Sequence, residues 1–162
     1  METSLKALLD NWKNGRSIVL KFLNELSEDD LVKQLPRKNQ NTIRLQMQEL
    51  LWVQSDFLDA IDTGRIAFTK QEPVSDLPKH ELTHRMTALD MRLENIMNSL
   101  TGNETIDYSS TTWHGGGLKN IHEHIAIMIG HEQMHIGQII AFCYAAGIHI
   151  PDGITSRMFL AG

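Results

Sequence analysis

Apolar residues recur every three or four positions along four long segments of the chain, the spacing expected for one face of an α-helix. The segments cover residues 3–26, 43–61, 79–100 and 118–146. No stretch alternates apolar and polar residues over more than a few positions, so the pattern predicts no strands. Four amphipathic helices without a sheet predict an all-α fold, a four-helix bundle.

Residues near the helix ends sharpen these boundaries. Thr3 or Ser4 is expected to be the N-cap of the first helix, and Gly15 within that helix permits a bend. Thr42 fits the N-cap of the second helix, and Gly64 fits the position just after its end, where glycine adopts the left-handed conformation at low cost.

Composition narrows the class of protein. The chain has 162 residues, of which 41% are hydrophobic and 22% charged, as expected for a single globular domain over residues 1–162. The net charge of -5 argues against nucleic acid and anionic membranes as partners, because both attract basic surfaces. One cysteine, an N-terminus without a signal peptide and no apolar run long enough to span a membrane predict a cytoplasmic protein.

The strongest chemical motif is "HEQMH", in which His131 and His135 lie four residues apart in the fourth predicted helix. Side chains at this spacing lie one turn apart on the same helix face, so both imidazoles can bind one metal ion. The same five residues fit the H-E-x-x-H signature of zinc peptidases, with Glu132 in the place of the general base.

The rest of the sequence argues against a peptidase. Ala141 stands where metzincins have their third histidine ligand, and Gln138 stands where they require glycine. No glutamate follows Glu132 to serve as the third ligand of the other zincins. No sheet is predicted that could hold an extended peptide. The peptidase interpretation is therefore strongly disfavoured.

The sequence "HEQMHIGQI", followed by Ala146-Gly147-Ile148 and Pro151, resembles the C-terminal helix of the DinB-like superfamily of DinB/YfiT-like metalloenzymes. The pattern of that family is H-x-x-x-H-R-G-Q-I, and this chain departs from it at Ile136, where arginine is usual. The resemblance implies a four-helix bundle with a divalent metal between the second and fourth helices. It also implies a homodimer.

In the family the third metal ligand is a histidine near the middle of the second helix. This chain has no histidine in that helix, and Glu49 in "QELLW" stands at the expected position. Two histidines and one carboxylate form a competent ligand set, so the predicted metal ligands are Glu49, His131 and His135. Gln48 and Asp56 are the alternatives, and Glu49 could also be an ordinary charge at the edge of the bundle. Zinc or nickel is the favoured ion, with iron and manganese as further candidates.

The resemblance implies one class of function. Some relatives transfer or isomerise substrates with small thiols such as bacillithiol, mycothiol or glutathione, so one hypothesis is a metal-dependent thiol S-transferase or hydrolase. The alternative is a non-enzymatic, stress-associated binding or scaffold protein whose metal site is degenerate or empty. The sequence assigns no catalytic residue.

Three other histidines have competing interpretations. His80 and His84 share the four-residue spacing but lie among charged residues, which favours a solvated helix face over a second metal site. His124 lies two turns before His131, too far along the helix to share its ion. We expect a core histidine there, with a proton shuttle or a substrate contact as the alternative.

Residues 101–117 form a 17-residue irregular stretch that ends in "WHGGG". The three glycines indicate a hinge, and Trp113 or His114 could form a lid over the metal site. An esterase oxyanion loop is rejected because no G-x-S-x-G motif is present. Cys143 is expected to be a small buried apolar residue.

Overall fold

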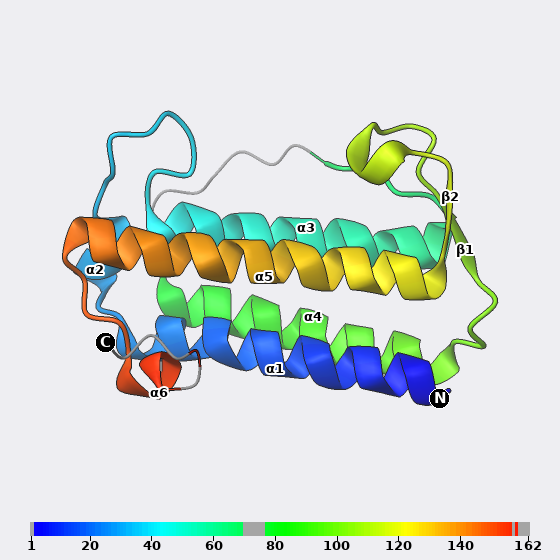
Figure 1. The fold of residues 1–162 in the computed structure, drawn as a ribbon, viewed down its shortest axis with the longest axis horizontal. Coiled ribbons are helices and arrows are strands. Elements are labelled where there is room, and N and C mark those ends of the chain that lie inside the picture. The colour runs from blue at the N-terminus through cyan, green and yellow to red at the C-terminus, as the bar shows by residue number, and fades with distance from the viewer. Residues whose placement is uncertain (1, 70–76, 157, 159–162) are drawn as a thin grey trace.

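The computed structural model describes residues 2–69, 77–156 and 158. Four long helices run through it (Figure 1), and they confirm the predicted all-α bundle: α1 (Thr3–Glu25), α3 (Ile43–Thr63), α4 (Lys79–Ser99) and α5 (Ile121–Ala146). Around the bundle, α1 contacts α5, α5 contacts α3, α3 contacts α4, and α4 contacts α1.

The direction of each helix determines which residues meet. Helices α3 and α5 lie side by side and run in opposite directions, as do α1 and α4 (Figure 1). Helices α1 and α5 run in the same direction, since Ser4 is hydrogen-bonded to His122 near one end and Arg16 is paired with Glu132 further along. The middle of α3 therefore faces the middle of α5, where the candidate metal ligands lie.

Most predicted helix ends are confirmed. The Thr42 hydroxyl accepts a hydrogen bond from the Leu45 amide at 3.1 Å, and Gly64 follows α3 with a φ of 72°. The predicted N-cap of α1 is wrong, because Thr3 and Ser4 lie inside the helix and the capping position, Glu2, makes no side-chain cap. The helix also passes through Gly15 without a break.

The predicted start of the fourth long helix, residue 118, is three residues before the observed start of α5 (Ile121–Ala146). Leu118–Asn120 form the short strand β2, which pairs antiparallel with β1 (Thr105–Asp107). Helix α5 begins after Asn120, whose side chain and Glu123 form a reciprocal capping box. Strands of three residues are too short to show an alternating pattern, which explains why the sequence did not reveal them.

Three short helical segments complete the described fold. Helix α2 (Glu28–Val32) follows α1 and is capped by Ser27. The 3₁₀ helix η1 (Trp113–Gly115) lies in the predicted loop before α5. The chain after α5 contains the short helix α6 (Asp152–Thr155).

The core is divided into two apolar halves by a polar layer. One half includes Phe22, Met47 and Ile139, and the other includes Leu5, Phe57 and Ile125. Between them each long helix contributes one polar side chain, and we call this set the polar layer: Arg16, Gln54, Asp90 and Glu132. The polar layer lies at the level of His131, the residue before Glu132.

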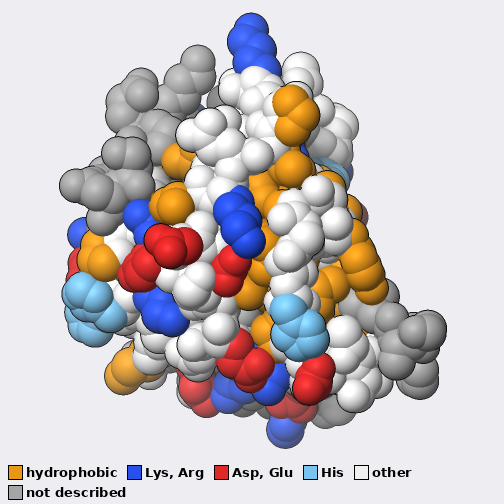
Figure 2. Space-filling model, turned by 90° about the vertical axis from the view of Figure 1, so that its left-hand side faces the viewer, with side chains coloured by type: hydrophobic (Ala, Val, Ile, Leu, Met, Phe, Trp, Pro, Cys, Tyr) orange, Lys and Arg blue, Asp and Glu red, His pale blue; other side chains and the backbone are white. Residues whose placement is uncertain are grey.

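Acidic and basic side chains are mixed on the end of the bundle that carries α2, with hydrophobic side chains showing between them (Figure 2). Within the described residues, no helix has both the length and the apolar character needed to cross a membrane.

Candidate metal centre

The structure brings the three predicted ligands together. One side-chain ligand atom from each of Glu49, His131 and His135 lies within 4.8 Å of the other two. Helix α3 supplies the carboxylate and α5 supplies both imidazoles, whose ring centroids are 4.6 Å apart. The two histidines are buried, whereas Glu49 is only half-buried and gives the centre one side that solvent can reach.

Both histidines are held in the neutral form that binds metal ions. Burial, together with the nearby charges of His135 and His114, lowers the pKa of His131 to about 3. Burial and the nearby guanidinium of Arg37 lower the pKa of His135 to about 4. At pH 7 both imidazoles are therefore unprotonated, and each has a lone pair available for a metal ion.

The donor atoms fit a divalent ion. The Nδ1 atom of His135 is buried and has no hydrogen-bond partner among the described residues, so a metal ion would satisfy it. Two imidazoles and a carboxylate suit zinc, nickel or iron. Glu49, His131 and His135 would hold such an ion, and it would supply Lewis-acid chemistry at the centre.

The alternatives to Glu49 lie in other environments. The Asp56 carboxylate accepts hydrogen bonds from the Thr69 amide at 2.9 Å and the Thr69 hydroxyl at 2.7 Å. Gln48 is fully buried, and its side chain takes part in another interaction. Only Glu49 joins the two histidines in a cluster of potential ligands within the described residues.

An aromatic side chain lies beside the cluster. The Trp113 ring is 5.7 Å from the His131 ring, measured between centroids, and 4.8 Å from the Phe68 ring. The peptide chain turns here through Gly115–Gly117, all three of which have φ values between 63° and 79°, in the left-handed region that favours glycine. The three glycines allow the tight turn between η1 and β2.

Glu132 extends toward α1, away from the candidate ligands. Its carboxylate lies 3.3 Å from the guanidinium of Arg16, and the two side chains are 2% and 3% exposed. Burial raises the pKa of Glu132 to about 7, Arg16 opposes the rise, and Asp90 adds to it. Because the Glu132 carboxylate is paired with Arg16 of α1, it is not placed to act as the general base of a peptidase. The geometry therefore also argues against that function.

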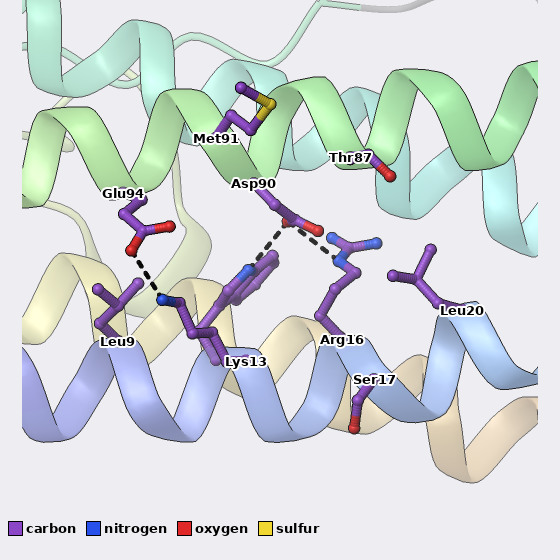
Figure 3. A pocket seen from close by; sticks show the side chains of 10 residues that line it. Leu9, Lys13, Arg16, Ser17, Leu20, Thr87, Asp90, Met91 and Glu94 are labelled. Carbon is purple, nitrogen blue, oxygen red and sulfur yellow. Dashed lines mark hydrogen bonds and ion pairs between the residues drawn. The ribbon is translucent and has the colours of Figure 1, made fainter.

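The other members of the polar layer complete this network. Arg16 donates a 2.7 Å hydrogen bond to the Gln54 side-chain oxygen and lies 3.3 Å from the Asp90 carboxylate. Asp90 also accepts hydrogen bonds from the Trp12 indole and the Gln54 amide, both at 3.0 Å. Arg16, Asp90 and Trp12 of this network line a pocket between α1 and α4, which the Lys13–Glu94 ion pair also lines (Figure 3).

A model of the DinB superfamily matches residues 11–139, which include all three candidate ligands. The chain belongs to the DinB superfamily. The match begins within α1 and ends within α5, so it includes all of α3 and α4 and most of α1 and α5 of this DinB bundle. Among curated proteins, none matches the chain.

Elsewhere in the DinB bundle, the environments of His80, His84 and His124 agree with the interpretations favoured from the sequence, a solvated helix face for the first two and a core position for the third. His80 and His84 are exposed on α4 and join no potential metal cluster among the described residues. His124 is fully buried; its Nε2–H donates to the Phe57 carbonyl and its Nδ1 accepts from the Tyr108 hydroxyl, both at 2.9 Å. It is a core histidine with both nitrogens engaged.

Cys143 is also a core residue, as expected. It is fully buried, and burial raises the pKa of its thiol to about 11. Ile136, where the family usually has arginine, is likewise fully buried in the apolar half that contains Cys143.

Sequence reasoning missed the polar layer around Glu132. Arg16, Gln54 and Asp90 occur where the apolar stripes of α1, α3 and α4 are interrupted, and this interruption was the available signal. Aligning the interruptions across four helices requires their relative register, which a single sequence does not provide.

Proposed function

We propose that this protein is a divalent-metal-dependent enzyme of the DinB superfamily that activates a small thiol or water for S-transfer or hydrolysis. The observation that carries the proposal is that one ligand atom each of Glu49, His131 and His135 lies within 4.8 Å of the other two, while the Nδ1 of His135 has no hydrogen-bond partner in the part of the chain that the structure describes. Zinc and nickel suit this ligand set best. A bound divalent ion lowers the pKa of the thiol or water that it binds.

The side chains of the bundle support an external thiol as the nucleophile. The thiol of Cys143 is buried and its pKa is raised to about 11, so it cannot act as a nucleophile at neutral pH. The half-buried Glu49 leaves one side of the centre accessible to a small molecule. Three protein ligands would leave a further coordination position free, as catalytic zinc sites do.

The test is a spectroscopic titration. Metal-free protein is loaded with Co²⁺, and 2-mercaptoethanol is added at pH 7. We expect a new thiolate-to-cobalt charge-transfer band that is absent when His135→Ala is treated in the same way. Cobalt bound without such a band would refute thiol activation and leave hydrolysis. Protein that binds no ion would refute both activities and favour the non-enzymatic alternative.

A further inference from the structure

The pocket between α1 and α4 lies on the side of the bundle opposite the candidate metal centre. Helices α3 and α5 carry the candidate ligands, and α1 and α4 lie below them in Figure 1. The pocket has a volume of about 250 Å³. An apolar cavity of about 150 Å³ holds benzene, so this volume suits a small ring that carries a substituent.

Apolar side chains form much of the pocket wall. Those from α1 are Leu9, Trp12 and Leu20, and α4 contributes Met91. Met91 is 63% exposed, so the pocket is open to solvent beside it. A wall of this kind stabilises the apolar body of a ligand by removing it from water.

A buried guanidinium lies among these apolar side chains. Arg16 is 3% exposed and extends from α1 towards Asp90 and Thr87 of α4 (Figure 3). Its Nη2 donates a hydrogen bond to Gln54, whereas its Nη1 is buried and has no hydrogen-bond partner among the described residues. Buried donors are almost always hydrogen-bonded, because each was bonded to water before folding. Nη1 is therefore a donor for which the described part of the bundle supplies no acceptor.

Asp90 places an acceptor beside this donor. The Trp12 indole, the Gln54 amide and the Arg16 Nε all contact the same carboxylate oxygen of Asp90, Oδ1. None of these three contacts uses the second oxygen, Oδ2, and the side chain is 23% exposed. One polar group of a ligand in the pocket can therefore accept from Arg16 and donate to Asp90.

Contacts within the bundle hold both groups in place. The guanidinium of Arg16 lies over the Trp12 ring, with its central carbon 4.8 Å from the ring centroid. Trp12 in turn donates a 3.0 Å hydrogen bond to Asp90. Because these side chains are already ordered, little conformational entropy is lost when a ligand binds to them.

The charges of the polar layer favour a neutral head group. An anionic ligand would be repelled by Asp90 and by Glu132, whose carboxylate lies 3.3 Å from Arg16. An ammonium group would be repelled by Arg16, and it has no lone pair to accept a hydrogen bond from Nη1. A hydroxyl group both accepts and donates, so it can satisfy Arg16 and Asp90 together.

We propose that this pocket is a second binding site, for a small alcohol or phenol. The hydroxyl lies between the Arg16 Nη1 and the Asp90 carboxylate, and the apolar body packs against Trp12, Leu20 and Met91. This inference is independent of the proposed function, because none of the three candidate metal ligands is among the described residues that line the pocket.

Four ligands that share one ring and differ in head group test this chemistry. Benzyl alcohol, toluene, benzoate and benzylamine are titrated into the isotope-labelled full chain. The indole N–H signal of Trp12, assigned by elimination with Trp52→Phe and Trp113→Phe, gives each Kd. We expect benzyl alcohol to shift this signal saturably and to bind at least about fivefold more tightly than the other three, because only benzyl alcohol makes both hydrogen bonds. Equal or tighter binding of any of the other three would overturn the hydroxyl as the recognised group.

Two substitutions on α4 test the location. Thr87 and Ala88 are both exposed, but of the two only Thr87 lines the pocket. Thr87→Phe should fill the pocket and raise the Kd for benzyl alcohol at least about tenfold, whereas the control Ala88→Phe should leave it unchanged. Equal effects of the two substitutions would overturn the proposal. A saturable shift of the Trp113 signal in place of that of Trp12, or no saturable shift of the Trp12 signal in wild type, would also overturn it.

Discussion

The carboxylate of Glu132 lies 3.3 Å from the guanidinium of Arg16, although the preceding residue, His131, faces α3 and the candidate metal centre. Successive residues of a helix are rotated by roughly 100°, so two neighbours in "HEQMH" take part in different structures. His131 belongs to the candidate metal centre and Glu132 to the polar layer. The layer links α5 to α1 and, through Arg16 and Asp90, to α4.

Removing Arg16 should severely destabilise the bundle. Arg16→Met leaves the buried carboxylate of Glu132 and that of Asp90 without their cation, and we expect the free energy of unfolding to fall by about 3–5 kcal/mol. Urea denaturation measures this change. Adding Glu132→Gln to the same variant should restore part of the loss, because one of the two stranded charges is removed. A loss below about 1 kcal/mol for Arg16→Met would contradict the role of the polar layer.

His124 should make the stability of the metal-free protein depend on pH. Burial lowers its pKa in the folded protein to about 4 from an ordinary 6.5. Between these values the unfolded chain binds a proton that the folded protein does not, so the free energy of unfolding decreases as pH falls from 6.5 to 4. The contribution of His124 is about 3 kcal/mol, present above pH 6.5 and lost by pH 4.

The His124→Gln variant isolates this contribution. His131 and His135, whose pKa values are also lowered, act in the same direction, whereas the raised pKa of Glu132 acts in the opposite direction. Urea denaturation from pH 7 to pH 4 should show a flatter pH dependence in the variant than in wild type. Parallel curves would mean that His124 is protonated in the folded protein at pH 6.

Trp113 should report metal binding by its fluorescence. Its ring lies 5.7 Å from His131, so a paramagnetic Co²⁺ ion at the candidate centre should quench its emission. Titration of metal-free protein with Co²⁺ measures the effect. The Trp113→Phe variant retains Trp12 and Trp52, and because Trp52 lies one turn after Glu49 on α3, the variant should lose part of the quenching and keep part of it. Quenching that is as deep in this variant as in wild type would contradict a bound ion beside Trp113.

The composition of the outer face of α5 indicates a surface through which two copies of this chain associate. Beyond Glu123 every exposed residue of α5 is uncharged: Ala126, Gly130, Gln133, Met134, Gly137, Ala141, Tyr144 and Ala145. A helix face that remains in water normally carries charged side chains. We therefore propose that this face forms the interface of a homodimer.

Sedimentation analysis tests the interface. Met134 is 48% exposed, and Met134→Glu should convert the dimer to a monomer by placing a charge in the apolar contact. The control is Met91→Glu on α4, where the methionine is 63% exposed and lies away from α5. A wild-type monomer, or a dimer that both variants preserve, would refute this interface.

The sequence predicted the four helices because their apolar positions follow one period over more than twenty residues. It also placed Glu49, His131 and His135, because the histidine spacing identifies one helix face and the family resemblance points to the middle of the second helix. The structure brings these three residues together, and metal binding itself stays a prediction. Glu49, for which the sequence also allowed an ordinary charge at the edge of the bundle, is half-buried.

Other features could not be inferred from local pattern. The strands β1 and β2 exist because two short segments meet, and neither has a signal of its own. The buried amide of Gln46, which has no hydrogen-bond partner among the described residues, is visible only once the fold is known, because a glutamine in a helix is usually exposed. Both features depend on contacts between segments far apart in the chain.

The central claim is that Glu49, His131 and His135 hold one divalent ion. Elemental analysis of tag-free protein, after reconstitution with Zn²⁺ and dialysis, tests it most directly, alongside Glu49→Gln, His131→Ala, His135→Ala and the control His84→Ala on the exposed face of α4. The account predicts about one equivalent of metal in wild type and control, and none in the three ligand variants. Metal-free wild type, or a full equivalent retained by His135→Ala, would contradict it.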